Sequence, residues 1–155
     1  PALALGMGKD DDSVLSHAPR NSDEKIIERP HWVFIFFYGS LITISVLCLF
    51  YSSLFILNLS IQKAVTLSFL TLGISQVFHV FNLRKKGSHF IFNEVTKNPY
   101  VLAAASLCLV LFVLSVHMPF LQSVLDLVPL NGGEWALVIG VSTLPILGQL
   151  FVKLK

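Results

Sequence analysis

Polar side chains gather within one otherwise apolar stretch of the sequence, residues 64–83, which contains no Asp, Glu, Lys or Arg. They are Ser68, Thr71, Ser75, Gln76, His79 and Asn82. Most of them recur at spacings of seven, four and three residues, which places them on one face of a helix. For the hydroxyls we favour hydrogen bonds between helices. An amide or imidazole is costly to leave unpaired in lipid, so Gln76 and His79 are candidates for a functional role.

The other candidate residues show no pattern of catalysis or metal binding. Cys48 and Cys108 fall in apolar stretches without metal-ligand spacing, as buried reduced thiols do. Ser115 and Ser142 are expected to hydrogen-bond to their own helices. The acidic run at residues 10–12 lacks the ligand spacing of a calcium-binding loop. There is neither a P-loop nor a Ser-His-Asp arrangement, so the sequence predicts no catalytic residue in this chain.

The composition indicates a membrane protein. The chain has 155 residues, of which 54% are hydrophobic and only 13% charged, whereas about a quarter is charged in soluble domains. The charges are clustered and leave four uncharged stretches long enough to cross a bilayer, residues 32–57, 64–83, 101–118 and 135–152. The prediction is an all-α membrane protein, with a polar segment at residues 1–31 followed by a four-helix transmembrane domain at residues 32–155.

The basic residues predict the orientation of this domain. Four spans place both termini and the loop at residues 84–97 on one side of the membrane. That side carries ten of the eleven Lys and Arg residues, and the other side carries only Lys63. By the positive-inside rule, both termini are expected in the cytoplasm. A net charge of +2 gives no sign of a nucleic-acid partner.

Several strings resemble, in order and spacing, the C-terminal membrane region of calcium-type P-type ATPases. They are residues 1–6 (end of transmembrane helix 6), 19–20 (the following cytosolic loop), 76–85 (helix 8 and its exit), Phe92 with 98–99 (the loop into helix 9), and 134–149 (helix 10). The resemblance covers essentially the whole chain and implies that the chain is the C-terminal part of a longer pump.

This resemblance implies what the whole pump does. It would export Ca²⁺ from the cytoplasm across the plasma membrane, using ATP and Mg²⁺ bound by domains upstream of this chain. The four helices here would brace the cation-binding helices, with the lipid bilayer and the upstream helices and cytoplasmic domains as partners. The chain alone would hold no cofactor and would neither hydrolyse ATP nor transport an ion.

The resemblance also assigns roles to particular residues. Gln76 falls at a helix 8 position where sarcoplasmic-type calcium pumps have a cation-binding Glu and plasma-membrane-type pumps have Gln. It would supply at most one neutral metal ligand, with Ser75 and His79 adjacent to the cation site. For His79, a hydrogen bond between helices is the default expectation. Asp11 matches an acidic position of the loop that couples the membrane sites to the phosphorylation domain, although residues 9–12 replace the usual proline pair.

Three alternatives stay open at this point. The pump could carry Na⁺, K⁺ or H⁺, because ion identity depends mainly on helices 4, 5 and 6. The chain could instead be an independent four-helix interaction subunit, or an inactive pump fragment. Its first residue, Pro1, fits either removal of an initiator Met or a piece of a longer protein.

Overall fold

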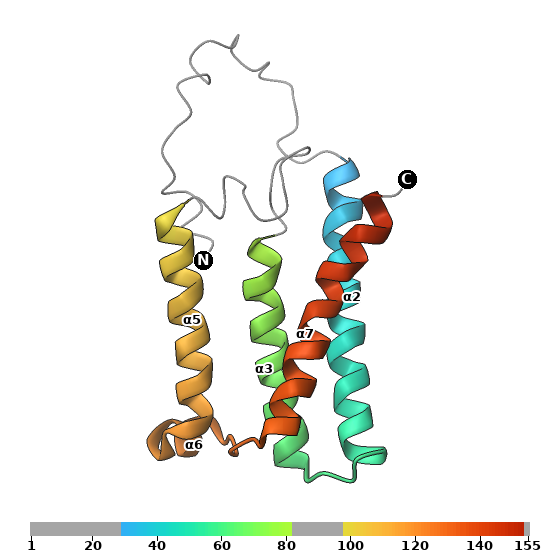
Figure 1. Ribbon diagram of the computed structural model, residues 1–155. Coiled ribbons are helices and arrows are strands. Elements are labelled where there is room, and N and C mark those ends of the chain that lie inside the picture. The colour runs from blue at the N-terminus through green and yellow to red at the C-terminus, as the bar shows by residue number, and fades with distance from the viewer. Residues whose placement is uncertain (1–28, 82–97, 154–155) are drawn as a thin grey trace.

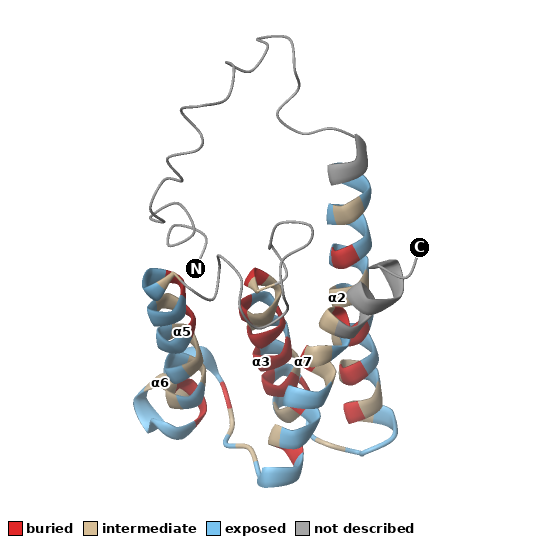
Figure 2. Ribbon diagram, turned by 45° about the horizontal axis from the view of Figure 1, so that its top comes forward, coloured by how far each residue is buried: buried red, intermediate tan, exposed pale blue. Residues whose placement is uncertain are grey.

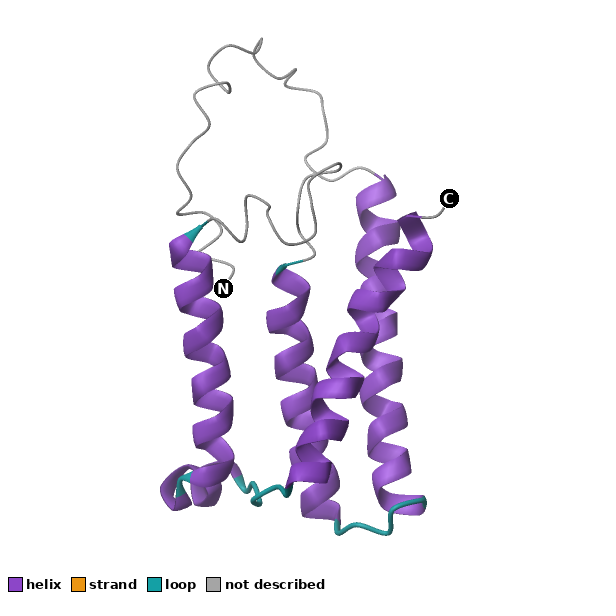
Figure 3. Cartoon of the chain, in the orientation of Figure 1, coloured by secondary structure: helices purple, strands orange, loops and turns teal. Residues whose placement is uncertain are grey.

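The computed structural model describes residues 29–81 and 98–153, with the side chains of residues 32–81 and 98–146. This part is all-helical (Figure 3). Its helices are α2 (Arg29–Phe55), α3 (Ile61–Val80), α5 (Pro99–His117), α6 (Pro119–Leu125) and α7 (Gly132–Lys153). Helices α2, α3 and α5 are long and apolar enough to cross a membrane, and α7 has a shorter apolar part at Gly132–Ile146. The prediction of an all-α fold with apolar spans is therefore confirmed, while residues 1–28 and the predicted basic loop at 84–97 lie outside the described residues.

The long helices lie side by side, and successive long helices along the chain run in opposite directions (Figure 1). We call the end where α2 begins and α3 ends the open end. The opposite end, which holds the short connections at residues 56–60 and 118–131, is the turn end. Helix α3 is central, because it packs extensively against α2 and α7 and less extensively against α5.

Local sequence signals set the helix boundaries. The Ser60 side chain accepts a hydrogen bond from the Lys63 backbone N–H and begins α3, and Asn98 caps Tyr100 in the same way before α5. Between the predicted spans at residues 101–118 and 135–152 the structure contains an additional short helix, α6, and α7 begins at Gly132, three residues before its predicted span. Pro119 starts α6 because its fixed φ suits a first helical turn and its missing N–H has no helical partner there.

Helix α3 contributes more buried side chains than any other described helix (Figure 2). A core cluster gathers residues from α3 with others from α2, α5, α7 and the loop before α7: Leu49, Leu67, Leu70, Ile74, Val116, Leu127 and Val138. Helices α3 and α7 run parallel in a fixed register. Lys63 pairs with Glu134, and eight residues further along each helix the Ser142 hydroxyl donates to the Thr71 carbonyl at 3.3 Å.

The turn end is held together by polar contacts to the start of α3. Lys63 Nζ lies 2.6 Å from Glu134 Oε1, and Glu134 is almost fully buried. Glu134 Oε2 also accepts from the Asn131 backbone N–H, while Asn131 Oδ1 accepts from the Glu134 N–H, a reciprocal cap that begins α7. Close by, the Thr66 hydroxyl oxygen accepts from the Val128 N–H at 3.2 Å. The start of α3 therefore fixes both α7 and the connection that precedes it.

We expect Lys63→Met to lower the free energy of unfolding by about 1–3 kcal/mol, because it leaves the buried Glu134 carboxylate without its counter-charge. Thermal unfolding of the protein in detergent measures this as a lower Tm. The double variant Lys63→Met/Glu134→Gln also removes the unpaired negative charge of Glu134 and should recover part of the lost stability. An unchanged Tm for Lys63→Met alone would show that the pair does not hold the turn end together.

The close contact between α3 and α5 depends on Gly73. A Cβ built on Gly73 would overlap the Phe112 ring, which lies directly against the glycine. The same ring meets Phe69 edge-on, at 6.0 Å between centroids. The missing side chain thus lets an aromatic ring of α5 pack onto the α3 backbone.

Gly73→Val should destabilise the protein by roughly 1–3 kcal/mol, because Phe112 must leave its position and α5 must move outward. Gly39→Val is the matched control, since a Cβ on Gly39 in α2 meets nothing within 4 Å. Thermal unfolding in detergent compares the two. Equal Tm values for both variants would contradict the packing role given to Gly73.

Candidate functional site

Helix α3 carries one face that is largely exposed in the described part of the chain, although the Phe69 ring at its edge also contacts Phe112 of α5. Val65, Phe69, Leu72 and Gln76 are all exposed, and they follow one another at spacings of four, three and four residues. These spacings form a single stripe on a helix. We call this stripe the open face of α3.

Gln76 is the polar member of the open face, in the half of α3 nearer the open end. Within the described residues its amide makes no hydrogen bond. An exposed amide on the same face as Phe69 and Leu72 is costly in contact with lipid, so it calls for a polar neighbour or an ion outside the described residues. Its carbonyl oxygen is a ligand type that hard cations accept.

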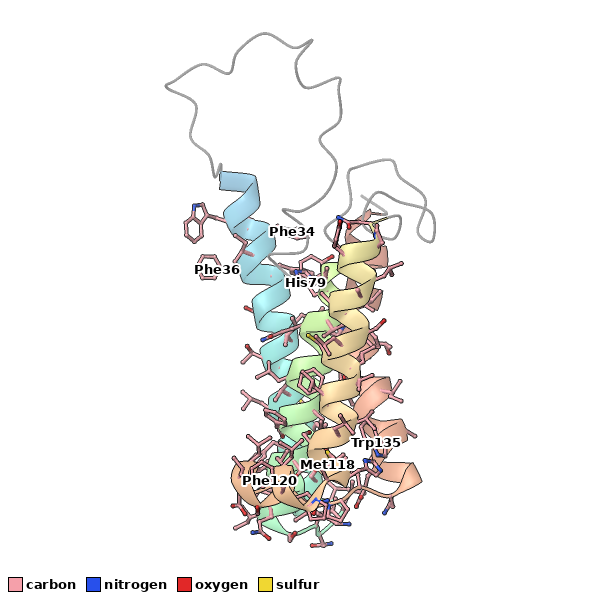
Figure 4. The ribbon with its side chains drawn as sticks, turned by 90° about the vertical axis from the view of Figure 1, so that its left-hand side faces the viewer. Phe34, Phe36, His79, Met118, Phe120 and Trp135 are labelled. Carbon is pink, nitrogen blue, oxygen red and sulfur yellow. The ribbon has the colours of Figure 1, made fainter. Side chains whose placement is uncertain are left out.

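Ser75 and His79 lie on a different face of α3, toward α2. The His79 ring lies 4.9 Å from the Tyr38 ring and 6.4 Å from the Phe34 ring, measured between centroids. Figure 4 shows His79 and Phe34 together near the open end of the bundle. Ser75, one turn away on the same face, is 1% exposed. The residues grouped with Gln76 from the sequence are therefore divided between an open face and a buried face.

The remaining positions singled out in the sequence define no further site in the described part of the chain. Asp11 and Asn82 lie outside the described residues. Among the residues that the structure describes, no group of three His, Cys, Asp or Glu side chains is close enough to hold a metal ion.

Two partners of α3 were missed in the sequence. Tyr38 of α2 packs against His79, and Ser142 of α7 bonds to α3 instead of to its own helix, which corrects the expectation for that serine. A signal for α2 was present, since Tyr38, Ser45 and Ser53 recur at spacings of seven and eight. That period places them on one face, and the structure buries all three.

Aromatic and sulfur-containing side chains mark the turn end (Figure 4). Trp135 stacks on His117 with ring centroids 6.3 Å apart, and Met118 and Phe120 are exposed nearby. Near the open end, in the first turns of α2, Trp32 and Phe36 are exposed, and their ring centroids are 6.1 Å apart. Indole rings near both ends are typical of helices that meet both membrane interfaces.

Comparison with known proteins identifies the family of this chain. The family model "Cation transporting ATPase, C-terminus" matches residues 1–154. The "Calcium-transporting ATPase" of Bacillus subtilis is 30% identical over 158 aligned residues that cover 100% of this chain, and "Calcium-transporting ATPase 1" of Lactococcus lactis is 29% identical over 99% of it. "Calcium-transporting ATPase 12, plasma membrane-type" of Arabidopsis thaliana is 28% identical over 92%.

The chain spans less than a fifth of the length of these relatives, since the matches cover 18%, 17% and 14% of them. They correspond to the family's C-terminal region, as the resemblance predicted. The apolar helices described above agree with a membrane location for that region. The chain belongs to the C-terminal region family of cation-transporting ATPases.

Proposed function

We propose that this chain is the C-terminal membrane region of an ATP-driven pump that exports Ca²⁺ from the cytoplasm. The observation that carries the proposal is the match over the whole chain to proteins named calcium-transporting ATPases. The open face of α3 supports it, because an exposed amide in a membrane helix calls for further protein beside it.

In this proposal α7 is a fourth span, and the open end faces the cytoplasm. The distribution of basic residues along the sequence supports both points, since ten of the eleven Lys and Arg residues fall within residues 1–29, 84–97 and 153–155, and Lys63 lies at the turn end. The membrane would be the plasma membrane. Asp11 would take part in coupling the membrane sites to the phosphorylation domain upstream.

The mechanical role of the chain would be to brace the cation-binding helices. Helices α2 and α7 hold α3 from two sides, and the Lys63–Glu134 pair fixes the register of α3 and α7. The open face then presents Gln76 at a fixed height to the helices that precede this chain. Gln76 would supply one neutral oxygen ligand or position a ligand of an upstream helix. Ser75 and His79, on the adjacent face, would stiffen the contact with α2.

The full-length pump should hydrolyse ATP in response to micromolar Ca²⁺. The assay compares ATP hydrolysis by the purified protein in lipid vesicles with added Ca²⁺, Na⁺ or K⁺. If only Na⁺ or K⁺ stimulates hydrolysis, the protein is still an ATP-driven pump, but the ion that it transports is not Ca²⁺. Absence of stimulation by any of the three ions would contradict the proposed transport function.

Gln76→Ala should raise the Ca²⁺ concentration that gives half-maximal ATP hydrolysis by about five- to thirtyfold, since loss of one neutral ligand costs about 1–2 kcal/mol. Leu72→Ala is the control, because it changes the same face without removing a polar atom. If both variants raise the half-maximal Ca²⁺ concentration equally, Gln76 contributes to helix packing and does not bind the ion. Gln76→Glu, which restores a carboxylate, tests whether charge at this position changes the number of Ca²⁺ ions moved per ATP.

A further inference from the structure

Helix α6 lies across the turn end of the bundle instead of continuing α5 (Figures 1 and 3). The chain turns at Met118, whose backbone is extended (φ −87°, ψ 119°), as is usual for the residue before a proline. The seven residues of α6 are all uncharged, and none of their side chains is buried. Among the described helices α6 packs mainly against α5, so much of its surface is left uncovered.

The polar side chains of α6 are bonded within the chain. Gln122 Nε2 donates at 2.7 Å to the carbonyl of Val116, which belongs to the last turn of α5, where carbonyls lack a helical partner. The Ser123 hydroxyl donates at 2.9 Å to a carbonyl of its own helix. Directly after α6, Asp126 Oδ1 accepts from Gln62 Nε2 of α3 at 3.2 Å. These bonds fix α6 to the ends of α5 and α3.

The opposite side of α6 presents its largest apolar side chains. Phe120 and Val124 each lie two residues from Gln122, a rotation of about 200° around the helix. Phe120 is 75% exposed, the highest value among the large apolar side chains of the described residues, and Val124 is 64% exposed. Figure 4 shows Phe120 beside Met118 at the turn end. A helix whose amide binds the bundle while its apolar side chains point outward has the reverse of the arrangement expected at a surface in water.

The turn end lies at the level of a membrane boundary. The apolar part of α2, Trp32–Phe55, has 24 residues, which is about 36 Å of helix, slightly more than the ~30 Å hydrocarbon core. The Trp135 ring stacks on His117 at the turn end, where an indole is typical of the interface. Helix α6 begins two residues after His117, so it is at the same boundary.

Lipid is the partner that fits the exposed side of α6. This side follows directly on the exposed apolar surface of α5, which includes Val110 and Val113 and is long and apolar enough to cross the membrane. Acyl chains remove Phe120 and Val124 from water and require no hydrogen bond from them. A helix in the plane of the membrane, with apolar side chains between headgroups and acyl chains, is the arrangement of interfacial helices in general.

We propose that α6 is an interfacial anchor, which inserts Phe120 and Val124 into the acyl-chain boundary of the leaflet at the turn end. Through Gln122 and Asp126 the anchor connects this leaflet to the ends of α5 and α3. The inference rests on the placement of the helices in a bilayer. It depends neither on the identity of the transported ion nor on which end of the bundle faces the cytoplasm, and it goes beyond the bracing role.

Fluorescence quenching of a thiol-linked dye tests the anchor. Single-cysteine variants Phe120→Cys and Val124→Cys of the full-length pump, with all other cysteines replaced by Ala, are labelled and placed in lipid vesicles. The quenchers are lipids brominated near the headgroup or near the chain ends, and iodide on both sides of the membrane. Gly132→Cys is the control in the polar connection, since a Cβ there meets nothing within 4 Å. The exposed native Cys48, kept as the only cysteine, is the control deeper along α2.

We expect lipid brominated near the headgroup to quench both α6 variants at least about threefold more than Gly132→Cys, and iodide to quench them less. Cys48 should respond more strongly to bromine near the chain ends. Quenching of both α6 variants by iodide as strongly as Gly132→Cys would overturn the anchor. Quenching by neither agent would also overturn it, because protein would then cover this side of α6.

The two α6 variants guard against a local defect, since Phe120 and Val124 are replaced separately and the same result is expected for each. The quenching measurement needs no ATP hydrolysis. A pump that failed to respond to Ca²⁺ would still show the expected quenching, so failure of the proposed function and failure of this inference are distinguishable.

Discussion

The constraint on which the rest of the structure depends is the placement of polar side chains on α3 within an apolar bundle. A hydroxyl or imidazole facing lipid loses its hydrogen bonds to water, so these side chains must face protein or enclosed water. Helix α2 covers the face with Ser75 and His79, while α7 covers the neighbouring face and bonds to the Thr71 carbonyl. The central position of α3 follows from this requirement, since its most polar faces are those that other helices cover.

The helices themselves could be predicted well from charge and hydropathy. The four uncharged stretches correspond to α2, α3, α5 and α7, and the predicted starts differ from the observed ones by about three residues at most. The differences have local causes, such as the Ser60 cap that begins α3 before Lys63. Helix α6 could not be predicted in this way because it is only seven residues long and too short for a periodic pattern. Pro129 and Asn131, residue types that favour turns, lie between α6 and α7.

The candidate site could be predicted only in part, because spacing shows which residues share a face but not what covers that face. Ser68, Ser75 and His79 were placed together from their spacing, and the structure turns them toward α2. Gln76 follows Ser75 directly, yet a rotation of about 100° per residue moves it out of that interface and onto the open face. The bond from Ser142 to another helix was also out of reach, since a sequence does not show which helices are neighbours.

The exposed faces of the bundle are not equivalent, and their difference indicates where more protein must lie. On α2 the exposed side chains are mainly apolar, and the exposed Thr43 hydroxyl is paired with the Gly39 carbonyl of its own helix. Such a surface can meet lipid without cost. Gln76 has no bond of this kind among the described residues, and an amide cannot satisfy all its donors and acceptors on its own helix. Among the described residues, the open face is thus a part of the surface that a bilayer alone does not satisfy, and this is why the proposed function places further protein beside it.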